Sequence, residues 1–270
     1  MRFDIKQADV RRLRPALGTL VGIEASAKSE ISALAAIDAA FEAIERVAAL
    51  MHPTAAGSDL SRVESTPVGQ AVAVDEWTYA VLFLAHTLHG LTDGVFDPCT
   101  PGRSGRMSDL DLSTPAAVTC RAPMALDLGG IAKGFAIDRA VQALAAHGCT
   151  AGLINAGGDM RVFGETPRAV IVRSAGGAVV EVEIANAALA VSGPRSPDSP
   201  REHRGYYRGG TGAATDGHFV AVTAAEAVLA DALTKCAMLC SRATADEVLK
   251  RYGARRIDAG HVPYFQASTR

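Results

Sequence analysis

The residues most able to do chemistry lie close together within residues 126–140. Asp127 ends an apolar run, and Gly129 and Gly130 follow it in a turn that lets the backbone approach a ligand closely. Lys133 stands where a helix begins. Free N–H groups at a helix N-terminus, a nearby cation and the lack of bulky side chains suit a phosphate group. The spacing fits neither the P-loop nor the G-x-G-x-x-G fingerprint, so a plain strand-to-helix turn is the competing interpretation.

Further candidates lie in a second glycine-rich turn and on a helix. Gly157, Gly158 and Asp159 follow directly after a predicted strand, although Gly-Gly-Asp is also a common turn. Asp231 falls on the mostly apolar face of a predicted helix, where an acid without a partner nearby in sequence invites a cation. Lys235 lies four residues later, so an ordinary i, i+4 ion pair on the helix surface is the competing explanation for both residues.

Hydrophobic periodicity indicates the elements that position these turns. Apolar residues recur every three or four positions over residues 31–51, which predicts a helix that ends before Pro53. Asp75 is a predicted N-cap, and residues 244–247 resemble a capping box. Further helices are predicted at 75–90, 131–147, 225–240 and 244–252, and strands at 18–25, 152–155, 161–163, 169–173, 179–184, 188–192 and 218–223.

The order of these elements favours an α+β fold. Most strands after residue 150 follow one another without an intervening helix, so we expect mixed, largely antiparallel sheets with packed helices rather than repeated βαβ units. A hairpin turn is expected at 174–177, loops at 100–114 and 193–216, and two short strands within 254–265. The absence of an internal repeat or linker predicts one domain over residues 1–270 with two intimately packed subregions.

Composition excludes several classes of partner. The formal net charge of −2 provides no basic field to hold nucleic acid or an anionic membrane surface. A hydrophobic content of 49% over 270 residues suffices for a large core, yet no apolar run is long enough to span a bilayer. The first ten residues are charged and lack the apolar core of a signal peptide, so we expect a cytoplasmic protein. Five cysteines without C-x-x-C spacing argue against a disulfide framework or a zinc site.

Taken together, these stretches resemble the ApbE family of flavin transferases, which use FAD and Mg²⁺ to attach FMN through a phosphoester to Ser or Thr of a target protein. The strongest piece is the Asp-Leu-Gly-Gly-Ile-Ala-Lys-Gly run at residues 127–134. The resemblance covers nearly the whole chain, and its supporting pieces are residues 14–19, 51, 58–62, 94–98, 155–159, 192–193 and 230–233. It implies an ApbE-like fold, FAD as substrate, Mg²⁺ as cofactor and FAD:protein FMN transferase activity.

The resemblance also implies roles for individual residues. The candidate FAD-binding residues are Asp127, Gly129, Gly130, Lys133, Gly157, Gly158, Asp159 and Ser192. The backbone carbonyl of Gly130 and the carboxylate of Asp231 would hold Mg²⁺, and Asp231 and Lys235 are the candidate catalytic residues. In the reaction so implied, a target hydroxyl attacks the FMN-side phosphorus while the metal neutralises the departing AMP.

The chain departs from the family's pattern at several positions. The family has Thr four residues after the acid matched by Asp231, whereas this chain has Lys235 there and carries Thr234 one residue early. An ammonium at that place would either replace part of the metal's charge or exclude the metal. The family's His-x-x-Asp-Pro-x-Thr-Gly segment is reduced to Thr211 and Gly212, and its aromatic residue in the first loop and its methionine before Gly-Thr are missing. Two alternatives therefore stand beside the transferase: a flavin-binding or interaction protein with impaired catalysis, and an FAD pyrophosphatase that uses water as acceptor.

Overall fold

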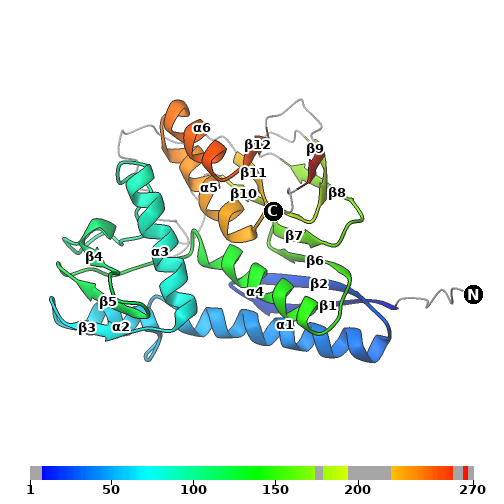
Figure 1. Cartoon of the computed structure of the whole chain (residues 1–270), viewed down its shortest axis with the longest axis horizontal. Helices are drawn as coiled ribbons and strands as arrows, with labels where there is room; N and C mark the ends of the chain where they lie inside the picture. Colours follow the sequence, from blue (N-terminus) through cyan, green and yellow to red (C-terminus); the bar gives the residue numbers. More distant parts are fainter. Residues whose placement is uncertain (1–7, 174–178, 194–219, 258–263, 267–270) are drawn as a thin grey trace, which may run out of the picture.

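The computed structural model describes residues 8–173, 179–193, 220–257 and 264–266. Its centre is a seven-stranded antiparallel sheet in the order β1-β2-β6-β7-β10-β11-β12 (Figure 1). The strands are β1 (Ala8–Ala16), β2 (Thr19–Ala27), β6 (Ala151–Ala156), β7 (Asp159–Phe163), β10 (Ala187–Ser192), β11 (Val220–Ala224) and β12 (Arg255–Ile257). Gly157 and Gly158 form the two-residue turn between β6 and β7, and both have the positive φ that such a hairpin favours.

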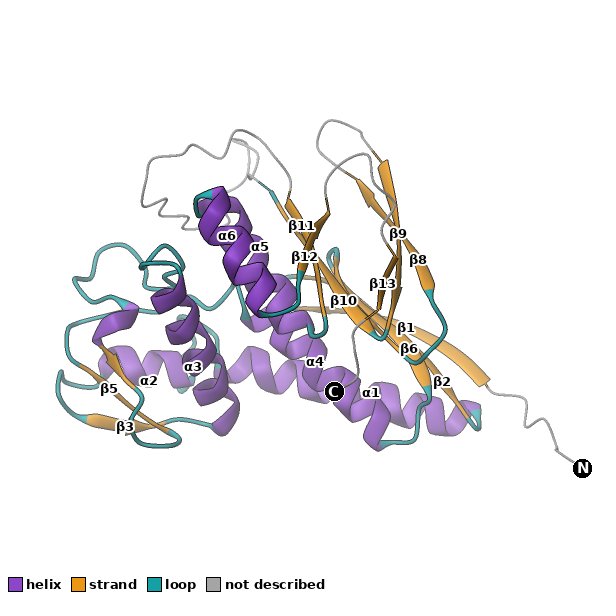
Figure 2. Cartoon of the chain, turned by 45° about the horizontal axis from the view of Figure 1, so that its top comes forward, coloured by secondary structure: helices purple, strands orange, loops and turns teal. Residues whose placement is uncertain are grey.

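Helices cover one face of this sheet (Figure 2). They are α1 (Glu30–Leu50), α4 (Ala132–Ala146) and α5 (Ala227–Leu239). Helix α1 buries most of the stripe that the periodicity predicts, including Ile37, Phe41 and Ile44. The prediction is wrong for Ile31, which lies in the first turn of the helix and is 81% exposed. Helix α4 lies between α1 and α5 and contacts both. The helix that follows the first glycine-rich turn is therefore packed on three sides, by two helices and by strands β6 and β7.

Two predicted helix starts can be compared with the structure. Asp75 caps α3 (Glu76–Leu91) as predicted, since its carboxylate accepts a hydrogen bond from the Trp77 N–H at 2.9 Å. Helix α6 (Arg242–Arg251) begins earlier than predicted. Its cap is Ser241, whose hydroxyl accepts from the Thr244 N–H at 3.2 Å. The predicted capping box at 244–247 is wrong, because those residues already lie within the helix.

A second, three-stranded sheet lies on the opposite side of the central sheet. It contains β8 (Arg168–Arg173), β9 (Val179–Ala185) and β13 (Tyr264–Gln266) in the order β13-β9-β8. Strands β8 and β9 pair antiparallel, as the predicted hairpin requires, and β13 pairs parallel with β9. The predicted turn at 174–177 and most of the predicted loop at 193–216 lie outside the described residues. A separate apolar cluster, including Val162, Val182 and Leu189, lies between the two sheets.

A smaller region occupies the left end of Figure 1 and adjoins the candidate site. Its elements are α2 (Asp59–Ser65), β3 (Ala71–Ala73), α3, the short helix η1 (Met107–Asp109), β4 (Leu110–Asp111) and β5 (Ala117–Cys120). The prediction of a loop over 100–114 is wrong for its second half, because η1 and β4 lie there and β4 pairs with β5. Met107 and Leu110 anchor this stretch in the core, since both are buried.

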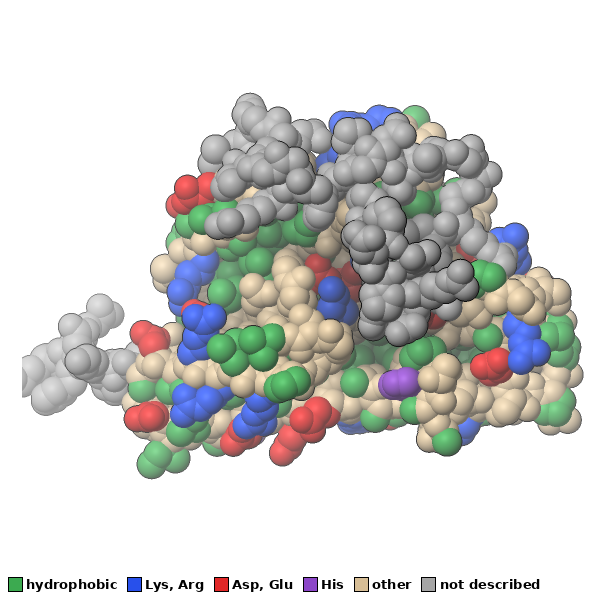
Figure 3. All heavy atoms as spheres, turned by 180° about the vertical axis from the view of Figure 1, so that it is seen from behind, with side chains coloured by type: hydrophobic (Ala, Val, Ile, Leu, Met, Phe, Trp, Pro, Cys, Tyr) green, Lys and Arg blue, Asp and Glu red, His purple; other side chains and the backbone are tan. Residues whose placement is uncertain are grey.

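The principal core is continuous across the helices, the central sheet and the smaller region. This agrees with the predicted α+β class, while the division into two subregions stays a prediction. In the part of the chain that the structure describes, no helix combines the length and the apolar character needed to cross a bilayer. On the face seen in Figure 3, the basic and acidic side chains of the described residues are interspersed.

Candidate functional site

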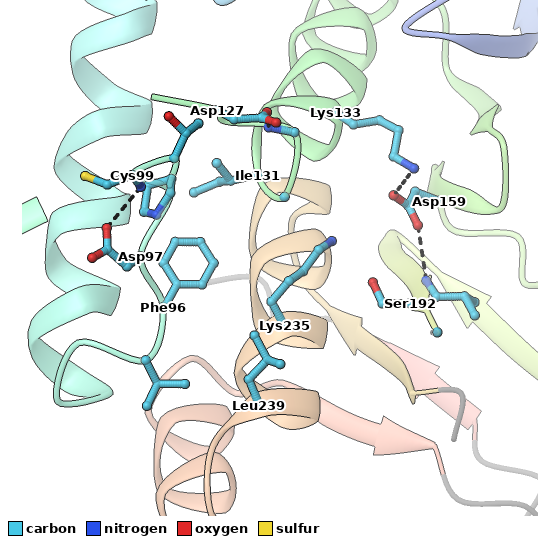
Figure 4. A pocket seen from close by; sticks show the side chains of 17 residues that line it. Phe96, Asp97, Cys99, Asp127, Ile131, Lys133, Asp159, Ser192, Lys235 and Leu239 are labelled. Carbon is cyan, nitrogen blue, oxygen red and sulfur yellow. Dashed lines mark hydrogen bonds and ion pairs between the residues drawn. The ribbon is translucent and has the colours of Figure 1, made fainter. Parts of the chain in front are cut away.

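A cavity of about 270 Å³ opens where the first glycine-rich turn, the start of β7, the end of β10 and helix α5 meet (Figure 4). Residues 95–100 close its remaining side. Lys133 enters it from α4 and Lys235 from α5. Its polar lining includes the carboxylates of Asp97, Asp127 and Asp159. The cavity therefore brings together residues separated by more than a hundred positions in the sequence.

Lys133 and Asp159 join the two glycine-rich turns. The Nζ atom of Lys133 lies 2.8 Å from Oδ2 of Asp159, and Oδ1 of Asp159 accepts a hydrogen bond from the Val191 N–H at 3.1 Å. Burial raises the pKa of Asp159, and the nearby charge of Asp231 raises it further, while Lys133 and Lys235 act in the opposite direction. The carboxylate fixes the direction in which the Lys133 ammonium points.

Asp231 is fully buried on α5 and binds the start of α4. Its Oδ2 accepts a hydrogen bond from the Gly134 N–H at 3.0 Å. The two helices approach so closely here that a Cβ on Gly134 would lie 2.2 Å from the Ala227 carbonyl oxygen. A carboxylate at a helix N-terminus is favoured by the helix dipole. Asp231, the predicted metal ligand, therefore also stabilises the N-terminus of α4.

The prediction of free N–H groups at this helix N-terminus is wrong for two of them. The Ala132 N–H donates to the Leu128 carbonyl at 2.8 Å, and the Gly134 N–H is bound by Asp231. The Gly129 N–H, in the turn before the helix, donates to Oδ1 of Asp127 at 2.8 Å. Protein acceptors already satisfy these amides, so the cationic side chains that the described lining offers to a ligand are Lys133 and Lys235.

Lys235 forms the i, i+4 ion pair with Asp231, although not on an exposed surface. Its ammonium contacts Oδ1 of Asp231 and donates to the Asp231 carbonyl at 2.9 Å. The Lys235 side chain is only 11% exposed and the Asp231 side chain 0%. The aliphatic part of Lys235 crosses Gly130, where a Cβ would lie 3.4 Å from its Cε. Both the aliphatic chain and the ammonium group of Lys235 thus make contacts that fix its position.

Ser192 and Thr234 form a hydroxyl pair beside this lysine. Their oxygen atoms are 2.7 Å apart, and the Thr234 hydroxyl donates to the Asp231 carbonyl at 2.7 Å. Since Thr234 has a single hydroxyl proton, Ser192 donates to Thr234 and keeps its own lone pairs as acceptors. Both residues are buried. This arrangement fixes the end of β10 against α5.

Most of the residues predicted for the site do line the cavity. Those that line it are Asp127, Gly129, Gly130, Lys133, Asp159, Ser192 and Lys235, with Asp231 directly behind Lys235. Gly157 and Gly158 lie outside this lining, so their contact with a ligand stays a prediction. In the structure Gly157 packs against Thr19, whose Oγ1 would lie 2.7 Å from an added Cβ. The Gly158 N–H donates to Asn155 at 3.0 Å, which shapes the turn that presents Asp159.

The segment at residues 95–100 was not assigned to the site from its sequence. Asp97 lines the cavity, accepts from the Cys99 N–H at 3.0 Å and lies 3.4 Å from the Arg106 guanidinium. The Asp127 N–H donates to the Pro98 carbonyl at 2.9 Å, which holds the segment beside the first turn. The signal that could have identified it is the Phe-Asp-Pro corner, an acid next to a residue that stiffens the backbone.

Asp231, one of the two predicted Mg²⁺ ligands, does not fit a metal ion as it is arranged, while the role of the Gly130 carbonyl stays a prediction. Both carboxylate oxygens of Asp231 are engaged, one by the Gly134 N–H and the other by the Lys235 ammonium. A divalent cation would compete with that ammonium for the same oxygen. Among the described residues, no three or more His, Cys, Asp or Glu side chains gather in a way that would hold a metal.

The fold and the cavity define a mixed α+β protein in which two lysines enter a cavity between two glycine-rich turns. The model of the ApbE family matches residues 17–103 and 103–257, so the chain belongs to the ApbE family. A curated relative, an FAD:protein FMN transferase from Rhodobacter capsulatus, is 26% identical over 187 residues. That match covers 58% of this chain and 35% of the relative, so the chain spans about a third of that protein.

Solved structures confirm the fold. The apo form of the flavinyl transferase ApbE from Pseudomonas stutzeri superimposes with a TM-score of 0.75 at 16% identity, covering 94% of this chain and 92% of that one. The flavin transferase ApbE from Vibrio cholerae gives 0.74 at 20% identity, with 93% of each chain covered. The ApbE protein from Thermotoga maritima gives 0.72 at 24% identity, covering 92% and 91%. The overall architecture of this chain is thus that of the ApbE proteins.

Proposed function

We propose that this chain is an FAD:protein FMN transferase, which moves FMN from FAD to a Ser or Thr hydroxyl of a target protein. The observation that carries the proposal is the cavity itself, where Lys133 and Lys235 converge between two glycine-rich turns in a member of the ApbE family. The curated relative bears the name of this activity, which supports the same assignment. FAD suits the cavity because a diphosphate carries the negative charge that the two ammonium groups attract.

The diphosphate is proposed to lie between the two ammonium groups. Gly129 and Gly130 line this part of the cavity and leave room for phosphate oxygens. Ser192 lies at its edge. Asp159 and Asp231 hold Lys133 and Lys235 in place before the substrate arrives, so binding costs less conformational entropy than it would with free lysine side chains. Asp127 shapes the first turn through its bond to the Gly129 N–H.

The transfer is an in-line substitution at phosphorus. The hydroxyl oxygen of the target Ser or Thr forms a bond to the FMN-side phosphorus while the bond from that phosphorus to the AMP phosphate oxygen breaks. The hydroxyl proton passes to water, and AMP leaves with the electron pair of the broken bond. Fixed cations beside the diphosphate stabilise the charge that develops on its oxygens, which is the principal contribution a protein makes to phosphoryl transfer.

The test is an incubation of the purified chain with FAD, with and without a protein that carries a flavinylation motif. AMP release and covalent flavin fluorescence on the acceptor are followed together. The proposal expects both, in equal amounts and only when the acceptor is present. AMP without covalent flavin would identify an FAD pyrophosphatase, and flavin binding without either product would identify a binding protein; each of these results would overturn the proposed activity.

A further inference from the structure

We propose that the Lys235 ammonium is the resident cation of this cavity, so that the chain binds the FAD diphosphate without a divalent metal ion. The inference deepens the proposed function and rests on it for the identity of the ligand. Its basis is the way in which the carboxylates of Asp159 and Asp231, two of those at the cavity, are satisfied.

Each of these carboxylates binds one ammonium group and one backbone amide. Asp159 accepts from Lys133 at 2.8 Å on one oxygen and from the Val191 N–H at 3.1 Å on the other. Asp231 repeats the pattern, with the Lys235 ammonium on Oδ1 and the Gly134 N–H at 3.0 Å on Oδ2. Both carboxylates are therefore matched within the protein, and their charges are balanced by lysine side chains that face the cavity.

Contacts along its whole length fix the conformation of the Lys235 side chain. Its ammonium also donates to the Asp231 backbone carbonyl, at 2.9 Å, and its stem lies over Gly130. Asp231 is in turn fixed by the close packing of α4 on α5 at Gly134. Because Asp231 and Gly134 are buried and Asp231 contacts the ammonium of Lys235, the cation is in place before any ligand binds.

A divalent ion at Asp231 would be strongly opposed. It would have to displace the Lys235 ammonium from Oδ1, and the displaced group would remain tethered to the same helix, only 11% exposed. Two cationic groups would then compete for one buried carboxylate, and like charges repel strongly where water is scarce. In contrast, the side chains of Lys133 and Lys235 line the cavity, so a diphosphate that enters it adds hydrogen bonds to these ammonium groups without displacing either of them.

Two measurements test the inference. The first compares the affinity of the chain for FAD in EDTA and in Mg²⁺. The second measures Mn²⁺ binding in the absence of flavin, from the electron paramagnetic resonance signal of free Mn²⁺. The wild-type chain is expected to bind FAD equally well in EDTA and in Mg²⁺, and to bind no Mn²⁺. Lys235→Met should weaken FAD binding in EDTA about tenfold, or roughly 1.4 kcal/mol. The matched control is Lys250→Met, which removes an exposed lysine from α6 and should leave FAD binding unchanged.

Three results would overturn the inference: FAD binding by the wild type that is at least tenfold weaker in EDTA, one Mn²⁺ bound per wild-type chain, or unchanged FAD affinity in Lys235→Met. The wild-type measurements need no variant to fold. If FAD does not bind in any condition, the proposed function fails, and Lys235→Thr still tests the part of the inference that needs no flavin, namely that Lys235 takes the place of a metal ion: Mn²⁺ binding gained by this variant supports that part, and no gain contradicts it. Circular dichroism of each variant confirms that it is folded.

Discussion

Lys133 in α4 and Asp159 at the start of β7 form an ion pair, with Nζ 2.8 Å from Oδ2, that joins the two glycine-rich turns of the chain. Asp159 is almost fully buried, whereas Lys133 is partly exposed toward the cavity. The buried carboxylate therefore holds the ammonium in place, and the ammonium is the more exposed group of the pair. Asp231 and Lys235 on α5 are arranged in the same way, with a buried carboxylate and a lysine that lines the cavity.

The stability contributed by Asp159 should depend on pH. Burial and the charge of Asp231 raise its pKa above the ordinary value of 3.8, so the folded state holds this proton more tightly than the unfolded state does. Its contribution is full below pH 3.8 and is lost as the pH rises through the raised pKa. Relative to Asp159→Asn, the wild-type chain should lose free energy of unfolding as the pH rises.

Chemical denaturation at a series of pH values measures this trend. Asp246→Asn is the control, because it removes an exposed carboxylate from α6 and should show no comparable slope relative to wild type. A wild-type chain that gained stability over Asp159→Asn with rising pH would contradict the assigned direction of the pKa shift.

Gly134 is required by the contact between α4 and α5. A Cβ at this position would lie 2.2 Å from the Ala227 carbonyl oxygen and 2.8 Å from the Asp231 Cβ, and neither neighbour is the end of a flexible side chain. Gly134→Ala should therefore lower the free energy of unfolding by about 3 kcal/mol, as overpacking does. Gly90→Ala in α3 is the matched control, because open space surrounds that position. This control should gain up to about 1 kcal/mol from helix propensity, and equal effects of the two changes would refute the packing argument.

Asp138 caps α5 from a neighbouring helix. Its two carboxylate oxygens accept from the Ala227 and Val228 N–H groups at 2.9 and 2.8 Å, and Arg161 pairs with it. Glu226, the N-cap residue of α5, makes no side-chain capping bond of its own. Asp138→Ala should cost about 3 kcal/mol or more in unfolding free energy, because it leaves amides and a largely buried guanidinium without their acceptor.

Ser241→Ala provides the comparison for this cap. It removes an ordinary local cap, at the start of α6, and should cost only about 1 kcal/mol. Thermal or urea denaturation of the two variants measures the difference. If Asp138→Ala were no more destabilising than Ser241→Ala, the capping of α5 by Asp138 would contribute little to stability.

Hydrophobic periodicity and turn residues predict much of the fold. They fail for strands that form only because they pair with another strand. The α1 stripe, the Asp75 cap and the hairpin strands of the central sheet follow from local patterns. The sequence does not predict strand β1, because it is an edge strand that is exposed along most of its length and therefore lacks the alternation of a half-buried strand. Strands β3, β4 and β5 are too short to show a period and exist through pairing with one another.

The sequence predicts the turns that line the site, but it does not predict the hydrogen bonds and the burial that connect distant residues within it. Glycine spacing locates Gly129 and Gly130, and the i, i+4 rule gives the pairing of Asp231 with Lys235. No local pattern reveals that Asp231 also binds the Gly134 N–H, because the two residues are 97 positions apart. The burial of this ion pair likewise depends on how α4 and α5 pack, which a single helix does not specify.

Binding of FAD through its diphosphate in this cavity is measured most directly by calorimetric titration of FAD, ADP and riboflavin into the wild type, Lys133→Met and Lys28→Met. Lys28 is exposed and distant in sequence from the cavity residues, so its loss serves as the control. We predict that the wild type binds FAD and ADP at least about tenfold more tightly than riboflavin, and that Lys133→Met weakens both by about tenfold while Lys28→Met does not. Riboflavin bound as tightly as FAD, or FAD bound equally by Lys133→Met and the wild type, would contradict a diphosphate site here.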